Sequence, residues 1–260
     1  MDTILECQEV SKFFGDFAAL DNVSFSVPRG IIFGIAGPNG AGKTTLFNVI
    51  TCNPFPPSSG KVIFNGEEIQ ELKSYEIVHR GIARTFQTPV IFKNLTYFKS
   101  VMVGSIYGNL TNLKHNVFGF DRHRYEKKAL ESLERVGITS KKDDFTQHAS
   151  LYDLKLLMIA SALATNPSLL CLDEPVSGLT DHEIELIWEL ISNIYKDLGI
   201  TTIIIEHIMK FLMNISDEVI ILNFGKVVCK GMPKNVANDE EVIKCYLGDE
   251  YKRVLKDMER

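Results

Sequence analysis

The stretch GPNGAGKT at Gly37–Thr44 decides the fold class, because it has the P-loop spacing of a glycine, four residues and then Gly-Lys-Thr. It follows the apolar run Ile31–Ile35 and precedes LFNVI at Leu46–Ile50, so it joins a predicted strand to a predicted helix. Glycines let the backbone curl until successive N–H groups point at phosphates, and a helix beginning near Lys43 adds the positive end of its dipole. The stretch therefore predicts a site for a nucleoside triphosphate.

The side chains of this loop carry separate predictions. Lys43 is expected to reach the β and γ phosphates, and the Thr44 hydroxyl is expected to bind Mg²⁺. The residues expected to hold the nucleotide are Gly37, Pro38, Asn39, Gly40, Ala41, Gly42, Lys43, Thr44 and Thr45.

Composition narrows the class of protein. The 260 residues are 45% hydrophobic, which suits one large domain or a domain with a subdomain. The net charge is −5 and no long basic block is present, which argues against nucleic acid as the main partner. The five cysteines are scattered without a CxxC pair, which indicates free thiols in a reducing cytosol.

The first ten residues and the apolar runs bear on membrane association. No basic region precedes an apolar stretch in MDTILECQEV, so no signal peptide is expected. Apolar runs such as Leu156–Ala164 are too short to span a bilayer. We therefore expect any link to a membrane to pass through a partner.

Apolar strands alternate with helical segments along much of the chain, which predicts an α/β fold with a mostly parallel, covered sheet. Helical periodicity dominates after about Thr88, and the charged tail from Asn238 is also predicted to be helical. The predicted strands are Val23–Val27, Ile31–Ile35, Lys61–Asn65, Ser168–Leu172, Thr201–Ile205 and Glu218–Leu222, and the clearest predicted helices are Arg124–Gly137, Leu151–Ala164 and Asp181–Leu198.

A second motif, LLCLDE at Leu169–Glu174, complements the P-loop. Four apolar residues followed by Asp-Glu predict a buried strand with two carboxylates at its C-terminal tip, where ligands bind in open parallel sheets. Asp173 is expected to hold Mg²⁺, and Glu174 is expected to orient and deprotonate an attacking water. An isolated Asp-Glu pair would indicate a solvated turn, but the upstream P-loop favours the functional interpretation.

Three further residues are candidates, each with an ordinary structural alternative. His207, directly after the Thr201–Ile205 strand, is expected to contact the γ-phosphate or to be a surface histidine. Gln87 is expected to contact the metal and the attacking water, or to be a loop residue. Phe14 is a candidate to stack on adenine, with Phe13 as its rival, although Phe13, Phe14 and Phe17 are also compatible with core positions.

In this order, the motifs resemble those of an ABC transporter ATPase subunit. They correspond to an A-loop (Phe14), Walker A, a Q-loop (Gln87), a signature segment, Walker B with Glu174, a D-loop and a switch histidine (His207). Five stretches are similar to branched-chain amino-acid importers and their urea-transporting relatives: Gly81–Gln87, Ile91–Thr96, Ser177–Thr180, Glu206–Pro233 and Val242–Glu250.

The resemblance implies a single ABC ATPase domain over residues 1–260. Its fold class is α/β, a P-loop NTPase (RecA-like) core with an antiparallel β-subdomain over 1–87 and 167–260, and an inserted α-helical subdomain over 88–166. It implies ATP and Mg²⁺ as cofactors, with Thr44, Gln87 and Asp173 as metal ligands and Glu174, Gln87 and His207 as catalytic residues.

The same resemblance implies partners and a location. Two ATPase subunits close on two ATP molecules, each held between one subunit's P-loop and the other's signature segment. Transmembrane permease subunits bind the pair at the cytoplasmic face of the cell membrane, and an extracytoplasmic solute-binding protein acts indirectly. Branched-chain amino acids as the solute come from the resemblance alone.

The signature segment departs from the family pattern. Counting back from the following helix places it at Ala149–Asp153, where LSGGQ or LAYGDQ is expected, and Tyr152 replaces a glycine. The residues expected to face the partner's ATP are Ser150, Leu151, Tyr152 and Asp153. Losing one preorganised donor costs on the order of 10²–10³ in rate, so we predict an asymmetric heterodimer in which the partner's ATP is hydrolysed slowly. The alternatives are that local rearrangement tolerates Tyr152, or that the chain is a low-turnover regulatory subunit.

Overall fold

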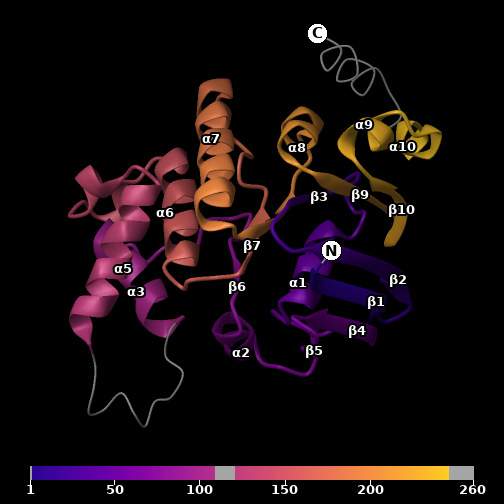
Figure 1. The fold of residues 1–260 in the computed structure, drawn as a ribbon, viewed down its shortest axis with the longest axis horizontal. Helices are drawn as coiled ribbons and strands as arrows, with labels where there is room; N and C mark the ends of the chain where they lie inside the picture. The colour runs from indigo at the N-terminus through magenta and orange to yellow at the C-terminus, as the bar shows by residue number, and fades with distance from the viewer. Residues whose placement is uncertain (1, 109–120, 246–260) are drawn as a thin grey trace.

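The P-loop lies between β3 (Ile32–Ala36) and α1 (Lys43–Ile50), in the middle of a six-stranded sheet with the order β10-β9-β3-β8-β7-β6. The computed structural model describes residues 2–108 and 121–245 (Figure 1). Strands β6 to β9 run parallel to β3, and β10 is antiparallel at one edge. The remaining strands of this sheet are β6 (Ile82–Arg84), β7 (Leu169–Asp173), β8 (Thr201–Ile205), β9 (Glu218–Asn223) and β10 (Lys226–Gly231).

A second, antiparallel sheet has the order β2-β1-β4-β5. Its residues share one apolar core with α1 and with one face of β3, so α1 packs between the two sheets. Its strands are β1 (Thr3–Phe14), β2 (Phe17–Pro28), β4 (Ser59–Phe64) and β5 (Glu67–Glu68).

The helices α3 (Tyr97–Tyr107), α5 (Arg122–Arg135) and α6 (Leu151–Leu163) pack together beside the β6 edge of the large sheet (Figure 1). Helix α6 is apolar on most sides because it lies in the main core. The other helices are α2 (Ser74–His79), α7 (Asp181–Leu198), α8 (Met209–Ile215), α9 (Pro233–Ala237) and α10 (Glu240–Cys245), with short 3₁₀ turns at Thr139–Lys141 and Thr146–His148.

Most predicted elements are found, and the differences are informative. Helix α7 has the predicted bounds because Thr180 and Glu183 form a capping box at its start and Gly199, with φ 62°, ends it. The predicted strand at Val23–Val27 is part of the longer β2, and the strand predicted from Lys61 begins at Ser59. The tail predicted as helical contains α10, whereas residues 246–250 of the Val242–Glu250 stretch lie outside the described residues.

Within the described residues, none of the helices has the length and apolar character needed to cross a membrane. Cys7, Cys52, Cys171 and Cys229 are free thiols, as predicted, and the side chain of Cys245 lies outside the described part of the chain.

Candidate nucleotide-binding site

The P-loop takes a backbone path that only glycine fits at two positions. Gly42 has φ 100°, and a Cβ there would come within 2.6 Å of the Ala19 carbonyl oxygen. Gly37 has φ 154°, and a Cβ there would come within 2.2 Å of the Leu222 carbonyl oxygen. The loop therefore lies in close contact with the neighbouring backbone. Thr44, in the first turn of α1, is exposed.

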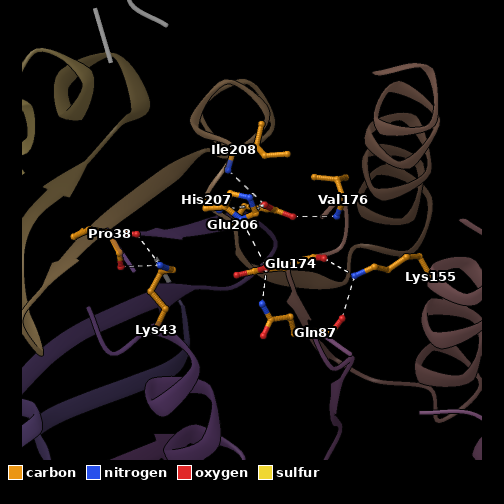
Figure 2. A network of polar contacts seen from close by, with 10 residues as sticks. Pro38, Lys43, Gln87, Lys155, Glu174, Val176, Glu206, His207 and Ile208 are labelled. Carbon is orange, nitrogen blue, oxygen red and sulfur yellow. Dashed lines mark hydrogen bonds and ion pairs between the residues drawn. The ribbon is translucent and has the colours of Figure 1, made fainter. Parts of the chain in front are cut away.

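Lys43 is buried at the centre of the loop. Its Nζ donates to the carbonyl oxygens of Gly37 at 2.6 Å and Pro38 at 3.1 Å (Figure 2). Burial lowers the pKa of Lys43, and the nearby carboxylates of Glu174 and Asp173 act in the opposite direction. The loop thus holds a cation beside its own N–H groups, which suits an anionic ligand.

Asp173 ends β7 with a buried carboxylate. Its Oδ2 accepts a hydrogen bond from Arg84 Nη2 at 2.8 Å, whereas its Oδ1 has no hydrogen-bond partner. Burial raises the pKa of Asp173, and the Arg84 guanidinium opposes that rise. A buried unpartnered carboxylate oxygen is costly unless it binds a ligand, and Mg²⁺ or its water is a ligand that such an oxygen suits.

Three predicted catalytic residues lie together beyond the tip of β7. Gln87 Nε2 donates to Glu174 Oε2 at 2.8 Å, and His207 Nδ1 lies 3.7 Å from the same oxygen (Figure 2). Glu174 adopts φ 48°, an uncommon conformation for a non-glycine residue. The Glu174 side chain is largely buried, and His207 is half-exposed. The structure brings these three side chains together, and the roles given to Gln87 and His207 stay predictions beside the alternatives of a loop glutamine and a satisfied surface histidine.

Glu206, which the sequence did not single out, is fully buried next to this group. Its carboxylate accepts hydrogen bonds from the backbone N–H groups of Val176 at 3.0 Å, His207 at 3.1 Å and Ile208 at 3.5 Å (Figure 2). Burial raises the pKa of Glu206 despite these donors. Glu206 therefore joins the turn after Glu174 to the turn that carries His207. An acidic residue at the end of the apolar Thr201–Ile205 run was the available signal.

Lys155 is a second residue that the sequence did not single out, and the structure places it at the site. Its Nζ donates to the carbonyl oxygens of Glu174 at 2.7 Å and Gln87 at 3.3 Å. Burial lowers the pKa of Lys155, with Glu206 as the largest opposing influence. Arg84 was also missed. The signal for both was a single basic residue inside an apolar stretch.

The signature segment forms the start of α6. Ser150 caps the helix by accepting a hydrogen bond from the Asp153 N–H at 3.1 Å. The buried Asp153 carboxylate pairs with Lys141 at 2.7 Å and accepts a hydrogen bond from the Tyr97 hydroxyl at 3.2 Å. Tyr152 is partly buried against the main core, and desolvation raises its pKa. Ser150 and Asp153 thus have partners within this chain, while Leu151 is exposed.

Phe14 is not a core residue. Its ring is half-exposed and makes an edge contact with Phe55 at a centroid distance of 5.1 Å. The Lys12 ammonium lies 5.5 Å from the Phe14 ring centroid. Phe13 and Phe17 are also exposed, so the interpretation of these rings as core is wrong, and the choice between Phe14 and Phe13 for adenine rests on position alone.

Comparisons with known proteins show the family to which this chain belongs. A model of the ABC transporter family matches residues 20–177. The chain is 34% identical over 251 residues to the high-affinity branched-chain amino acid transport ATP-binding protein BraF of Pseudomonas aeruginosa, covering 95% of this chain and 98% of that protein. It is 34% identical over 253 residues to the probable branched-chain amino acid transport ATP-binding protein LivG of Methanocaldococcus jannaschii, with 95% and 98% covered.

The fold is also that of solved ATP-binding cassettes. The ADP conformation of an ATP-binding cassette of an ABC transporter superposes with a TM-score of 0.84 and 32% identity, covering 96% of this chain and 100% of that one. The expected fold class, a P-loop NTPase core with an antiparallel β-subdomain and an inserted helical subdomain, is confirmed. The chain belongs to the ABC transporter family, as one of its ATP-binding ATPase subunits.

Proposed function

We propose that this chain hydrolyses ATP to energise an ABC importer for branched-chain amino acids or a related small polar solute, from the cytoplasmic face of the cell membrane. The observation that carries the proposal is that Gln87 and His207 both lie against the Glu174 carboxylate (Figure 2). This group lies at the C-terminal end of the parallel strands, where the P-loop also lies. The two relatives named above support the choice of solute, because their names specify branched-chain amino acid transport.

In the proposed site, Lys43 and the P-loop N–H groups bind the phosphates. Thr44, Asp173 and Gln87 hold Mg²⁺, and the free Oδ1 of Asp173 is the oxygen available for it. When bound, Mg²⁺ neutralises charge on the phosphate oxygens. Phe14 offers an exposed ring to the adenine.

Glu174 acts as the general base in this proposal. One carboxylate oxygen takes the proton of the attacking water, while the Gln87 amide holds the other side of the same group. His207 stands beside this carboxylate and donates to the γ-phosphate. Lys155 and Glu206 act indirectly, because they hold the backbone of the segments that carry these side chains.

The helical part, residues 88–166, is proposed to carry the signature segment and to meet the permease subunits, with 1–87 and 167–260 as the core. A cavity of about 320 Å³ is lined by residues on both sides of Gln87 in the sequence, by α3 and by α6. Its lining includes the exposed apolar side chains Val90 and Phe92. A permease segment with an apolar face would fit there, next to Gln87, whose side chain contacts Glu174.

The partner cassette is proposed to be a different chain, because Tyr152 stands where a glycine is expected. A side chain at this position limits the close approach of backbone N–H groups to a phosphate across the dimer. The ATP held by this chain is then the one hydrolysed rapidly, and the ATP held by the partner turns over slowly. If both sites turned over slowly, the chain would instead be a regulatory subunit.

Separate substitution of the two catalytic glutamates tests this proposal. In the purified heterodimer, Glu174→Gln should abolish most of the turnover, whereas the matching change in the partner should leave most of it. The opposite result would show that the asymmetry is reversed. Equal losses would show that Tyr152 is tolerated, and negligible turnover of the unmodified heterodimer would favour the regulatory role. Uptake of labelled leucine by cells carrying Glu174→Gln tests the solute.

A further inference from the structure

Arg84, at the end of β6, lies where three segments of the site meet. Its Nη1 donates to Asn48 Oδ1 at 2.7 Å and to Thr51 Oγ1 at 3.3 Å, both at the C-terminal end of the P-loop helix. Its Nη2 donates to Asp173 Oδ2 at 2.8 Å. One guanidinium therefore joins the P-loop helix to the carboxylate at the tip of β7.

Aromatic rings enclose the same guanidinium. Its carbon lies 5.3 Å from the centroid of the Phe47 ring and 5.0 Å from that of Phe86, one residue before Gln87. The side chains of Arg84 and Asp173 are only 6% and 2% exposed, so the ion pair is almost fully removed from solvent. An uncompensated charge at either residue would be costly, because neither is accessible to water.

The geometry leaves Asp173 with one engaged oxygen and one free oxygen. Because Arg84 is fixed by Asn48 and by the two rings, its bond to Oδ2 fixes the rotation of the carboxylate. Oδ1 is buried and has no partner. A planar guanidinium can hold two acceptors in different directions at once, whereas an ammonium acts as a point charge.

We propose that Arg84 is a positioning residue that fixes the Asp173 carboxylate so that its free oxygen faces the metal bound with ATP. The inference rests on the proposed function, because it assumes that Asp173 serves Mg²⁺. Without Arg84, the carboxylate is free to rotate, and the contribution of Mg²⁺ to nucleotide binding falls. Binding of metal-free ATP should persist, because it depends on the P-loop N–H groups and Lys43.

The experiment measures binding of a fluorescent ATP analogue to the full chain at increasing Mg²⁺, with EDTA as the metal-free reference. The variants are Arg84→Gln and Arg84→Lys. The matched control is Arg80→Gln, because Arg80 forms an exposed ion pair with Glu67 nearby on the chain. Partners of metal ligands typically contribute 10–100-fold to metal affinity, so Arg84→Gln should weaken the apparent Mg²⁺ affinity by about that factor.

Each outcome has a distinct meaning. If Mg²⁺ does not affect binding to the unmodified chain, the metal site of the proposed function is wrong. If Mg²⁺ strengthens binding equally in the unmodified chain and both Arg84 variants, the inference is wrong and the proposed function stands. Equal losses with and without Mg²⁺ indicate a merely structural role and also overturn it. If Arg84→Gln does not fold, Arg84→Lys decides, because it keeps the buried charge paired and should still weaken Mg²⁺ dependence.

Discussion

Replacing Lys155 by methionine tests how the signature helix is coupled to the catalytic glutamate. Lys155 Nζ donates to the backbone carbonyls of Glu174 and Gln87 at 2.7 and 3.3 Å. Methionine keeps an unbranched side chain of similar length but donates to neither carbonyl. We expect turnover to fall while nucleotide affinity stays close to that of the unmodified protein.

The magnitude follows from the two contacts. A hydrogen bond from a charged donor contributes about 1.5–3 kcal/mol net, and only the shorter bond, to Glu174, has the length expected of a charge-assisted one. Glu174 needs this support because a non-glycine residue in the left-handed region costs about 1–2 kcal/mol. If about 1.4–2.7 kcal/mol of the bias toward this backbone geometry is lost, the rate falls by about 10–100-fold.

The free energy of unfolding should change less than the activation free energy of hydrolysis. Lys155→Met removes the two hydrogen bonds but also removes the cost of burying an ammonium group, so the two effects partly cancel. We expect the free energy of unfolding to fall by about 1 kcal/mol or less.

The assay is steady-state ATP hydrolysis by the assembled transporter, with kcat and KM determined separately, together with urea unfolding of the isolated chain. Lys196→Met is the matched control, because Lys196 is an exposed helical lysine in α7. A kcat within twofold of the unmodified protein, in a folded variant, would refute the coupling. A rise in KM without a fall in kcat would place Lys155 in nucleotide binding instead.

Three other predictions follow from the site. Gly42→Ala should abolish nucleotide binding and lower the free energy of unfolding by more than Gly40→Ala, because a Cβ at Gly42 would meet the Ala19 carbonyl oxygen whereas one at Gly40 would meet nothing within 4 Å. Urea unfolding and ATP titration check this prediction. Burial raises the pKa of Glu206 in the folded state, so the stability this group contributes is full at low pH and is lost as the pH rises through that pKa. Glu206→Gln should therefore gain stability relative to the unmodified protein as the pH rises, and a pH-independent difference in urea unfolding would contradict this. In a heterodimer carrying Glu174→Gln, Tyr152→Gly should raise the residual ATPase rate by about 10²-fold or more, and an unchanged rate would argue against the role given to the tyrosine.

The parts of the site that could be predicted are those encoded by short local patterns. The P-loop needs glycine at fixed places, and the Asp-Glu pair needs an apolar strand before it, so both can be read without knowing the neighbours. His207 was predicted from its position after a strand, whereas Gln87 was a candidate within the stretch Gly81–Gln87. The parallel pairing of β6, β7 and β8 brings both residues to the C-terminal end of the strands. Strand β1 was not predicted individually, because bulges between Cys7 and Lys12 interrupt its alternation.

Arg84, Lys155 and Glu206 could not be predicted because their meaning depends on what surrounds them. A basic residue in an apolar stretch is equally compatible with a side chain that extends to solvent. Only the pairing of β6 with β7 places Arg84 against Asp173, and only the packing of α6 places Lys155 against the carbonyls of Glu174 and Gln87.

The sequence alone determined that this chain binds a nucleoside triphosphate on a parallel α/β core. Phosphate binding by backbone N–H groups requires glycines at a fixed local spacing, and this spacing can be recognised without knowing which residues surround it. The tertiary structure alone decided how the carboxylates of that site are held. A buried charge must find its partner among residues far apart in the chain, and the fold rather than the local sequence brings those residues within hydrogen-bond distance.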